Sequence, residues 1–173
     1  VTCIIANEGS GVSQAIGTGG RDVKDAVGGI TFLDAMQALA DDRGTKVIVL
    51  VAKPPQPGVL KKIYALIRKI KKPVVALFWG EGGTPATLEQ AALLAVAHAN
   101  GDDPVKALAH LTRRDEILQA EARSTVGQRK NPHGRYLRGL FSGGTFCAEA
   151  QVVLDGVVRH LYSNAPLGAS QKL

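Results

Sequence analysis

The sequence predicts an α/β fold built around a parallel sheet. Three short apolar runs, at residues 12–17, 46–52 and 73–79, have the length of strands, and each leads into a loop rich in glycine or proline. Stretches with helical spacing of apolar residues separate these runs, and this alternation is typical of parallel βαβ units. Ligands of such sheets bind beyond the carboxyl ends of the strands. We therefore expect the functional loops at one edge of the sheet.

The elements at the start of the chain follow from apolar spacing and turn residues. Residues 1–7 are expected to end a helix, since the glycines that follow are typical helix-ending residues. The strand at residues 12–17 opens into a loop over residues 17–29. Thr31 is a suitable N-cap for a helix that continues to Ala40, with its apolar residues on one face.

The next two strands share a common pattern. Residues 46–52 are apolar on both faces, as in a strand that helices cover on both sides. A helix at residues 59–70 turns its lysines outward, and the strand at residues 73–79 leads to a glycine-rich loop. A further helix is expected to begin near Thr87 and to extend to about His98.

After the first hundred residues the sequence becomes more polar. Residues 104–111 and 115–122 predict short helices, and residues 124–135 predict a polar linker or loop. We therefore assign residues 1–100 to a first α/β unit and residues 101–135 to a helical linker.

The last part of the chain repeats the order of strand, glycine loop and helix. A strand is expected at residues 136–141 and a helix at residues 145–163. The side chains of that helix expected to face inward are Phe146, Ala150, Val153 and Val157. Residues 136–173 would then begin a second α/β unit.

The formal net charge is +6, and much of the positive charge lies on the helix predicted at residues 59–70. The simplest interpretation is a solvated helix face, and the functional one is attraction of phosphate-bearing small molecules. No nucleic-acid motif accompanies these charges, and aromatic residues make up only 5% of the chain, so we expect no nucleic-acid partner.

The two cysteines, Cys3 and Cys147, have neither the spacing of a metal site nor that of a disulfide framework. Reduced cysteines are typical of the cytoplasm, which is the location we expect. No apolar run approaches the ~20 residues needed to span a membrane, so no membrane partner is expected. The first residue is not methionine, which indicates a part of a longer protein.

The glycine loop after the first predicted strand is the first candidate binding site. Gly19 and Gly20 lack a Cβ, so their backbone N–H groups are open to an anion. A tight turn with positive φ explains the same glycines without a ligand. Arg21 offers a guanidinium fork for phosphate or carboxylate, although a surface ion pair with Asp22 is the simpler interpretation. Lys53, held between a strand end and two prolines, is a candidate anion contact.

The second candidate site is the loop formed by Ser142, Gly143, Gly144 and Thr145. Free backbone N–H groups and the positive end of the helix dipole favour an anion at the start of a helix. A hydroxyl N-cap from Ser142 or Thr145 is the alternative, and both uses involve the same groups. Cys147 follows in the first helical turn and is interpreted as a packing residue.

Several segments carry a resemblance to a known family. Residues 15–22 (AIGTGGRD) and 28–39 (GGITFLDAMQAL) resemble the ligase domain of the succinyl-CoA synthetase alpha-subunit superfamily. Residues 72–80 (KPVVALFWG) are similar to the next strand and loop of that domain. Within the superfamily, the FdrA branch is the more similar one, through residues 16–22, 51–55 and 138–150.

This resemblance implies a flavodoxin-like, parallel-sheet ligase domain followed by the start of a second, beta-like ligase domain. It also implies acyl-CoA synthetase chemistry, with CoA and ATP or ADP (with Mg) as cofactors, in a homo- or hetero-oligomer. In the family, helix ends from both domains face the phosphate of a phosphohistidine, and the helix that begins at residues 143–145 would be one of them. The family's Gly-His-Ala-Gly loop corresponds to residues 80–87, which contain no histidine.

Two functions remain open at this point. The first is an FdrA-like enzyme that transfers an acyl or carbamoyl group through an acyl-phosphate-type species and binds CoA, nucleotide or phosphate between two ligase domains. The second is a non-catalytic regulatory or scaffold subunit that keeps the fold without the phosphohistidine. No catalytic residue or metal site is assigned. The residues predicted to bind phosphate or substrate are Gly19, Gly20, Arg21, Lys53, Ser142, Gly143, Gly144 and Thr145.

Overall fold

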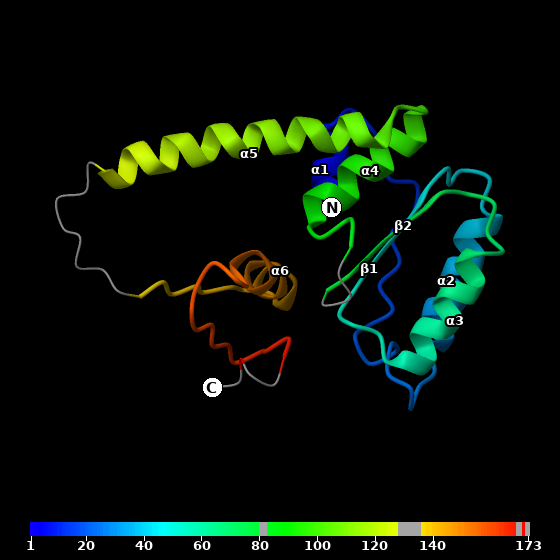
Figure 1. Cartoon of the computed structure of the whole chain (residues 1–173). Helices are drawn as coiled ribbons and strands as arrows, with labels where there is room; N and C mark the ends of the chain where they lie inside the picture. Colours follow the sequence, from blue (N-terminus) through cyan, green and yellow to red (C-terminus); the bar gives the residue numbers. More distant parts are fainter. Residues whose placement is uncertain (80–82, 128–135, 169–170, 172–173) are drawn as a thin grey trace.

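Two parallel strands and six helices make up the described part of the chain. The structure, a computed structural model, describes residues 1–79, 83–127, 136–168 and 171. The elements are α1 (Thr2–Asn7), α2 (Ile30–Asp41), β1 (Ile48–Ala52), α3 (Pro57–Ile67), β2 (Val74–Phe78), α4 (Leu88–Asn100), α5 (Pro104–Gly127) and α6 (Gly144–Leu154) (Figure 1). The predicted α/β class is confirmed, with two strands in the described residues rather than the four expected.

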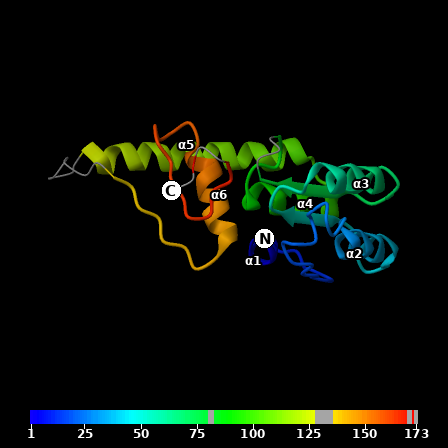
Figure 2. The ribbon, with the colours of Figure 1, turned by 90° about the horizontal axis from the view of Figure 1, so that it is seen from below.

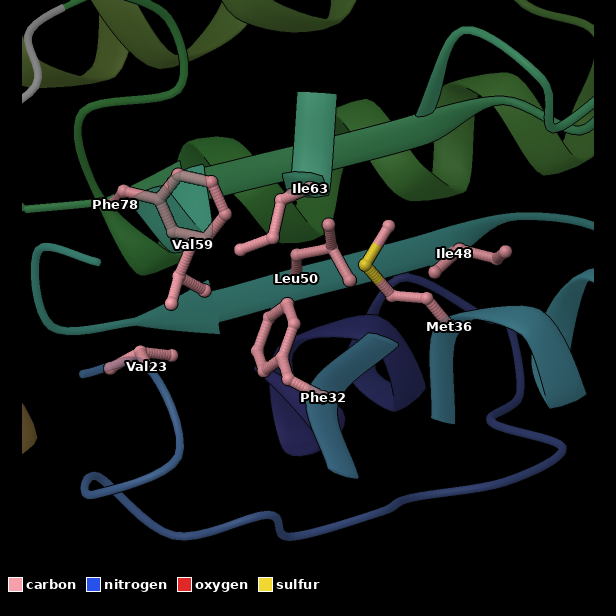
Figure 3. Close-up of a cluster of buried hydrophobic side chains, with 8 residues drawn as sticks. All are labelled: Val23, Phe32, Met36, Ile48, Leu50, Val59, Ile63 and Phe78. Atoms are coloured by element: carbon pink, nitrogen blue, oxygen red, sulfur yellow. The ribbon is translucent and has the colours of Figure 1, made fainter. Parts of the chain in front are cut away.

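The two strands lie side by side in parallel, with Ile48 opposite Val74 and Ala52 opposite Phe78. Because side chains alternate along a strand, every second residue faces the same side of the sheet. On one side, the strands pack against α2 and α3. Figure 3 shows the buried side chains of this cluster, which are Val23, Phe32, Met36, Ile48, Leu50, Val59, Ile63 and Phe78.

The opposite face of the sheet packs against α4 and α6. The buried residues of this second cluster are Val75, Leu77, Trp79, Leu88, Ala91, Leu94, Ala95 and Ala148. Burial of each large apolar side chain stabilises the fold by roughly 1.5–3 kcal/mol. The sheet is therefore sandwiched between helices, with α2 and α3 on one side and α4 on the other (Figure 1).

The strand predicted at residues 12–17 is wrong. These residues form no regular secondary structure, and Val12 and Ile16 are 44% and 50% exposed. Small and polar residues separate the two apolar ones, so strand pairing would bury little apolar surface. A side-chain contact holds the start of the segment, because the hydroxyl oxygens of Ser13 and Thr45 lie 2.9 Å apart.

The strand predicted at residues 136–141 is also wrong. Tyr136, Leu137 and Leu140 are exposed, and the segment has no strand partner within the described residues. An isolated strand cannot pair its backbone groups, so an apolar run alone does not make one.

The helix predicted at residues 145–163 is shorter and faces the other way. α6 ends at Leu154, and three of the four side chains expected inside are exposed, Phe146 by 63%, Val153 by 54% and Val157 by 75%, while Ala150 is half-buried. Ala148 is buried instead. A small residue there lets the helix lie close to the sheet, and this contact decides which face of α6 is covered.

One long helix replaces the two short helices predicted at 104–111 and 115–122. No glycine or proline lies between those segments, so the backbone continues in helical form from Pro104 to Gly127. With 24 residues, α5 is about 36 Å long, and its far end projects beyond the other elements (Figures 1 and 2). None of the described helices is long and apolar enough to cross a lipid bilayer.

Asp22 caps α2 from a distance in the sequence. Its carboxylate accepts hydrogen bonds from the backbone N–H groups of Thr31 at 3.1 Å and Phe32 at 2.7 Å. Thr31 is therefore not the N-cap as predicted; the N-cap residue is Gly29, in the left-handed conformation. Asp22 is also buried, so the simple surface pair with Arg21 is not its role.

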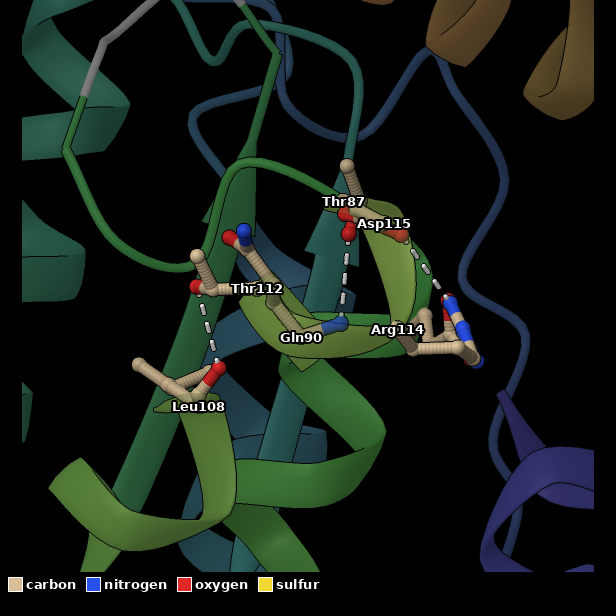
Figure 4. A network of polar contacts seen from close by, with 7 residues as sticks. Thr87, Gln90, Leu108, Thr112, Arg114 and Asp115 are labelled. Atoms are coloured by element: carbon tan, nitrogen blue, oxygen red, sulfur yellow. Dashed lines mark hydrogen bonds and ion pairs between the residues drawn. The ribbon is translucent and has the colours of Figure 1, made fainter. Parts of the chain in front are cut away.

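The N-termini of α3 and α4 also receive side-chain acceptors. Asp25 accepts from a backbone N–H in the first turn of α3 at 3.1 Å. α4 begins near Thr87, as predicted; Thr87 is its N-cap, and the Thr87 hydroxyl accepts from the N–H of Gln90 at 3.2 Å (Figure 4). The Glu149 carboxylate of α6 accepts from the N–H of Leu88 at 2.6 Å, which links α6 to α4.

An ion pair joins α5 to α4. The Arg114 guanidinium donates to the Glu89 carboxylate at 2.5 and 2.7 Å and also lies 3.5 Å from Asp115 (Figure 4). The hydrogen bond from Arg114 holds the pKa of Glu89 below its ordinary value of 4.5. Leu111 is the buried residue of α5.

Replacing the buried carboxylate at the start of α2 tests its capping role. We expect Asp22→Asn to lower the free energy of unfolding by about 1 kcal/mol, because an amide has one acceptor oxygen in place of two and no charge. Urea unfolding followed by circular dichroism measures the change. Asp34→Asn, at an exposed position of the same helix, is the matched control. Equal effects of the two variants would contradict the capping role.

The ion pair between α4 and α5 predicts a pH dependence. Glu89 has a lowered folded pKa, so its contribution to stability is complete above the unfolded pKa and disappears as the pH falls through the folded pKa. We expect Arg114→Gln to lower the urea midpoint slightly at pH 7, since the pair is partly exposed. The difference from the unmodified protein should shrink as the pH falls through the lowered pKa of Glu89. A difference that is constant with pH argues against a role for the pair.

Candidate functional site

A groove of about 940 Å³ runs along β1. One wall is formed by residues 46–53, and the other by the irregular segment of residues 10–20. Residues of α1, α2 and α4 complete a lining that is mainly apolar. β2 occupies the other edge of β1, so within the described residues no strand pairs with the edge that faces the groove. Small-molecule sites typically have volumes of roughly 300–1,000 Å³, so the groove is large enough for one.

Lys53 and Trp79 come directly after the two strands, at one end of the groove. Ala52 and Phe78 are the last pair in register, and of the two residues that follow them, Trp79 packs in the cluster on the opposite face of the sheet. That face carries α6, and both residues line the groove. The Lys53 Nζ lies 3.9 Å from the position that a Cβ on Gly144 would occupy. The sheet thus directs an ammonium group to the first turn of α6.

The N-terminus of α6 differs electrostatically from those of α2, α3 and α4. Side chains accept from first-turn N–H groups of those three helices, whereas within the described residues no side chain accepts from the first turn of α6, which has Gly143 as its N-cap and no acidic residue. The unpaired N–H groups of a first helical turn carry partial positive charge. Lys53 adds a full positive charge where the other three helices have an acceptor side chain. The arrangement attracts an anion.

The structure brings most of the predicted site residues to this end of the groove. Those that line the groove are Gly19, Gly20, Lys53 and Thr145, and Thr18 lines it with them. Gly144 lies beside Lys53, and Gly143 is the N-cap of α6. Segments 125 residues apart in the sequence (Gly20 and Thr145) therefore meet at one groove.

Two predicted residues lie elsewhere. Arg21 is exposed and does not line the groove. Ser142 lines a separate hollow of about 520 Å³, whose other lining residues are Leu140, Phe141, Phe146, Glu149, Ala150 and Val153. The structure thus groups neither residue with Lys53, because the chain turns away from the groove on both sides of the predicted loops.

The glycine loop needs glycine at one position for its conformation. Gly19 has a φ of +77°, which side-chain-bearing residues rarely adopt, so the tight-turn interpretation accounts for it. A Cβ added to Gly17 or Gly20 would meet no atom within 4 Å, so crowding does not require either glycine. The backbone of this loop remains accessible from the groove, as an anion contact requires.

Sequence reasoning missed Trp79 as a site residue. Its side chain is 3% exposed, and the indole Nε1 has no hydrogen-bond partner within the described residues. Its position in the sequence could have identified it. Trp79 is the last residue of the third predicted strand, and Lys53 directly follows the second. Sequence reasoning treated Trp79 only as the last residue of an apolar run.

Other chemically active side chains lie away from the groove. His98, His110 and His160 are exposed on the surface and do not line it. Cys147 is half-buried, and its sulfur accepts from the Gln151 amide at 3.4 Å, which agrees with the predicted packing role. Among the residues that the structure describes, no group of three His, Cys, Asp or Glu side chains could hold a metal. Glu81 and His133 lie outside the described residues.

The link between α6 and α4 can be tested through the reactivity of the cysteine in α6. We expect Glu149→Ala to raise the alkylation rate of Cys147 by about tenfold, because the acceptor for the Leu88 N–H is lost and α6 opens more often. Iodoacetamide labelling in a Cys3→Ser background isolates this thiol. Glu149→Gln, which keeps an acceptor oxygen, should have a smaller effect. Glu116→Ala, on the exposed surface of α5, is the control, and a rate unaffected by Glu149→Ala would disprove the link.

The chain was also compared with known proteins. No family model matches the chain. The chain is 38% identical over 161 residues to the uncharacterized protein YahF of Escherichia coli strain K12. The match covers 90% of this chain and 31% of YahF, so the chain spans about a third of the length of that relative.

Proposed function

We propose that this chain is part of an FdrA-like protein of the acyl-CoA synthetase superfamily, and that it binds the phosphate group of a phosphorylated or CoA-type ligand. The supporting observation is the Lys53 ammonium beside the uncapped start of α6. Both groups are electropositive, so they repel each other weakly when alone and both attract an anion placed between them. We also propose that the chain folds as a flavodoxin-like ligase domain.

The proposed ligand contacts come from both walls of the groove. Lys53 supplies the full charge, and the first-turn N–H groups of α6 supply directional donors. Thr145 adds a hydroxyl, and the backbone of Gly19 and Gly20 approaches from the opposite wall. A phosphoryl group presents several acceptor oxygens in a tetrahedral arrangement and can accept from donors on several sides. Arg21 and Ser142 are not assigned to this contact set.

The rest of the ligand would lie along the groove. Its apolar walls beside β1 fit the uncharged portion of a CoA thioester or an adenine nucleotide. For ATP or ADP, we propose that Mg²⁺ arrives bound to the nucleotide phosphates, as is usual for this ion. The partners proposed are therefore small phosphorylated molecules, with cytoplasmic location and neither nucleic acid nor membrane involved.

The chemistry that we propose is transfer of an acyl or carbamoyl group from an acyl-phosphate-type species. The bond between the acyl carbon and the bridging oxygen breaks, the acceptor's nucleophile forms a new bond to that carbon, and the phosphate leaves with the electron pair and takes up the acceptor's proton. The donors around Lys53 and α6 would stabilise the charge that the phosphate gains. The family's phosphohistidine has no counterpart in residues 80–87, so the phosphate is held here by non-covalent contacts.

A non-catalytic subunit is the second candidate function. The observation that favours it is the exposed position of His98, His110 and His160, away from the groove. Such a subunit would bind the same anion and regulate a partner without turnover. In either case, we propose that a second ligase domain, or another subunit of a homo- or hetero-oligomer, faces the groove.

A change at Lys53 tests the proposed anion site. We expect Lys53→Met to weaken the binding of inorganic phosphate and CoA by about tenfold to a hundredfold, since a hydrogen bond to a charged group contributes roughly 1.5–3 kcal/mol. Isothermal titration calorimetry measures both affinities. Lys69→Met, which changes a lysine outside the groove, is the control. It should bind as the unmodified protein does.

The outcomes separate the two functions. Binding that survives Lys53→Met, or no binding of any phosphate-bearing probe by the unmodified protein, would overturn the site. Release of inorganic phosphate from carbamoyl phosphate or acetyl phosphate, dependent on added CoA or oxamate and lost in Lys53→Met, supports the enzyme. Binding without phosphate release supports the non-catalytic subunit.

A further inference from the structure

We infer that the free edge of β1 binds the pantetheine arm of a CoA-type ligand through backbone hydrogen bonds, so that the groove prefers such a ligand to an adenine nucleotide. The inference rests on the proposed function and names the substrate class of that site. The pantetheine arm is a flexible chain that carries two amide groups and is attached to phosphate. ATP and ADP have no amide chain of this kind.

The pairing of β1 with β2 determines which backbone groups of β1 face the groove. The strands are parallel, and the N–H of Ile48 donates to the carbonyl oxygen of Pro73 at 3.0 Å. In a parallel ladder, successive residues direct their N–H and C=O groups alternately to the two edges of the strand. Ile48 and every second residue after it therefore pair with β2. The backbone groups of Val49 and Val51 point to the opposite edge, which faces the groove.

The groove-facing backbone groups of Val49 and Val51 are unpaired and open to a ligand. Within the described residues, no strand pairs with this edge, and no other backbone group forms a hydrogen bond with it. Both residues are half-buried and line the groove, whose other wall is the irregular segment of residues 10–20. Backbone groups that are partly removed from water need a partner. A ligand with peptide-like groups supplies one, as an added strand does at an open sheet edge.

The spacing of these backbone donors suits the pantetheine arm. The N–H groups of Val49 and Val51 belong to alternate residues, so they are about 6.6 Å apart along the strand. The two amide carbonyl groups of the arm are separated by a β-alanine unit, which spans about 5 Å when extended. Each carbonyl oxygen can therefore accept from one of the two N–H groups. Lys53 follows Val51 by two residues, and the phosphate end of the arm would lie there.

The anion site and the strand edge differ in what they can select. Lys53 and the start of α6 attract any phosphate group, whether it belongs to CoA, ATP or ADP. The edge of β1 offers two further hydrogen bonds that a ligand with two amide carbonyl groups can use together. Two neutral hydrogen bonds correspond to about tenfold in affinity. We therefore expect 4′-phosphopantetheine to bind about tenfold more tightly than inorganic phosphate does.

Amide hydrogen exchange in the unmodified protein tests the inference directly. The probes are 4′-phosphopantetheine, ADP and inorganic phosphate, and NMR follows exchange at each backbone N–H. We expect saturating 4′-phosphopantetheine to slow exchange at Val49 and Val51 by about tenfold, and ADP and inorganic phosphate to have little effect there. Ile48 and Leu50 are the internal control, because their N–H groups already pair with β2.

A proline variant supplies the affinity measurement. Val49→Pro removes one groove-facing N–H, and a strand tolerates proline where the N–H is not part of the ladder. We expect the affinity for 4′-phosphopantetheine to fall by about fivefold, with the affinity for inorganic phosphate unchanged. Val105→Pro, in the first turn of α5 and outside the groove, is the matched control. The urea midpoint establishes whether each variant is folded, and the exchange experiment needs no variant.

The possible results distinguish this inference from the proposed function. Phosphate binding that depends on Lys53, with exchange at Val49 and Val51 unaffected by 4′-phosphopantetheine, would overturn the inference and leave the anion site standing. Equal protection of these two residues by ADP would refute the preference. Slow exchange at both before any ligand is added would show that a peptide strand already covers the edge, which also contradicts the inference. Absence of binding by every phosphate-bearing probe would overturn both proposals.

Discussion

The docking of α6 on the sheet is the constraint on which the rest of the structure depends. Ala148 packs in the cluster that contains Trp79, and the Glu149 carboxylate accepts from the Leu88 N–H of α4 at 2.6 Å. A side chain of α6 therefore satisfies the start of another helix, while no described side chain accepts from the first turn of α6 itself. The same docking brings that N-terminus to Lys53. An uncapped helix becomes part of a groove only because of this contact.

The helix termini show where local rules hold and where they fail. Asp22, Asp25 and Glu149 provide acceptors to α2, α3 and α4, and each lies outside the helix that it caps. These bonds join separate segments and lower the local electrostatic cost of each terminus. At α6 a lysine occupies the region where an acceptor is expected. Proteins commonly break a local rule at a functional site, and this exception is the reason to place the anion there.

The sequence predicted the central elements well and the flanking ones poorly. The apolar runs at residues 46–52 and 73–79 contain β1 and β2, because runs that are apolar on both faces can only be buried between layers. The run at residues 12–17 has polar and small residues between its apolar ones. Whether it forms a strand therefore depends on which other segment packs against it. The face of α6 was predicted from apolar spacing, yet the small Ala148 rather than Phe146 meets the sheet. A large apolar side chain is buried only where another part of the chain packs against it.

By itself, the sequence determined that the chain has an α/β fold and that Lys53 directly follows a buried strand, since these follow from local pattern and chain direction. Only the tertiary structure decided which of these residues meet. It placed Lys53 and Thr145 at one groove, moved Arg21 and Ser142 away from it, and added Trp79. The physical reason is that the pairing register and the docking of α6 depend on contacts between distant segments. Such contacts leave no local pattern in the chain that could reveal them.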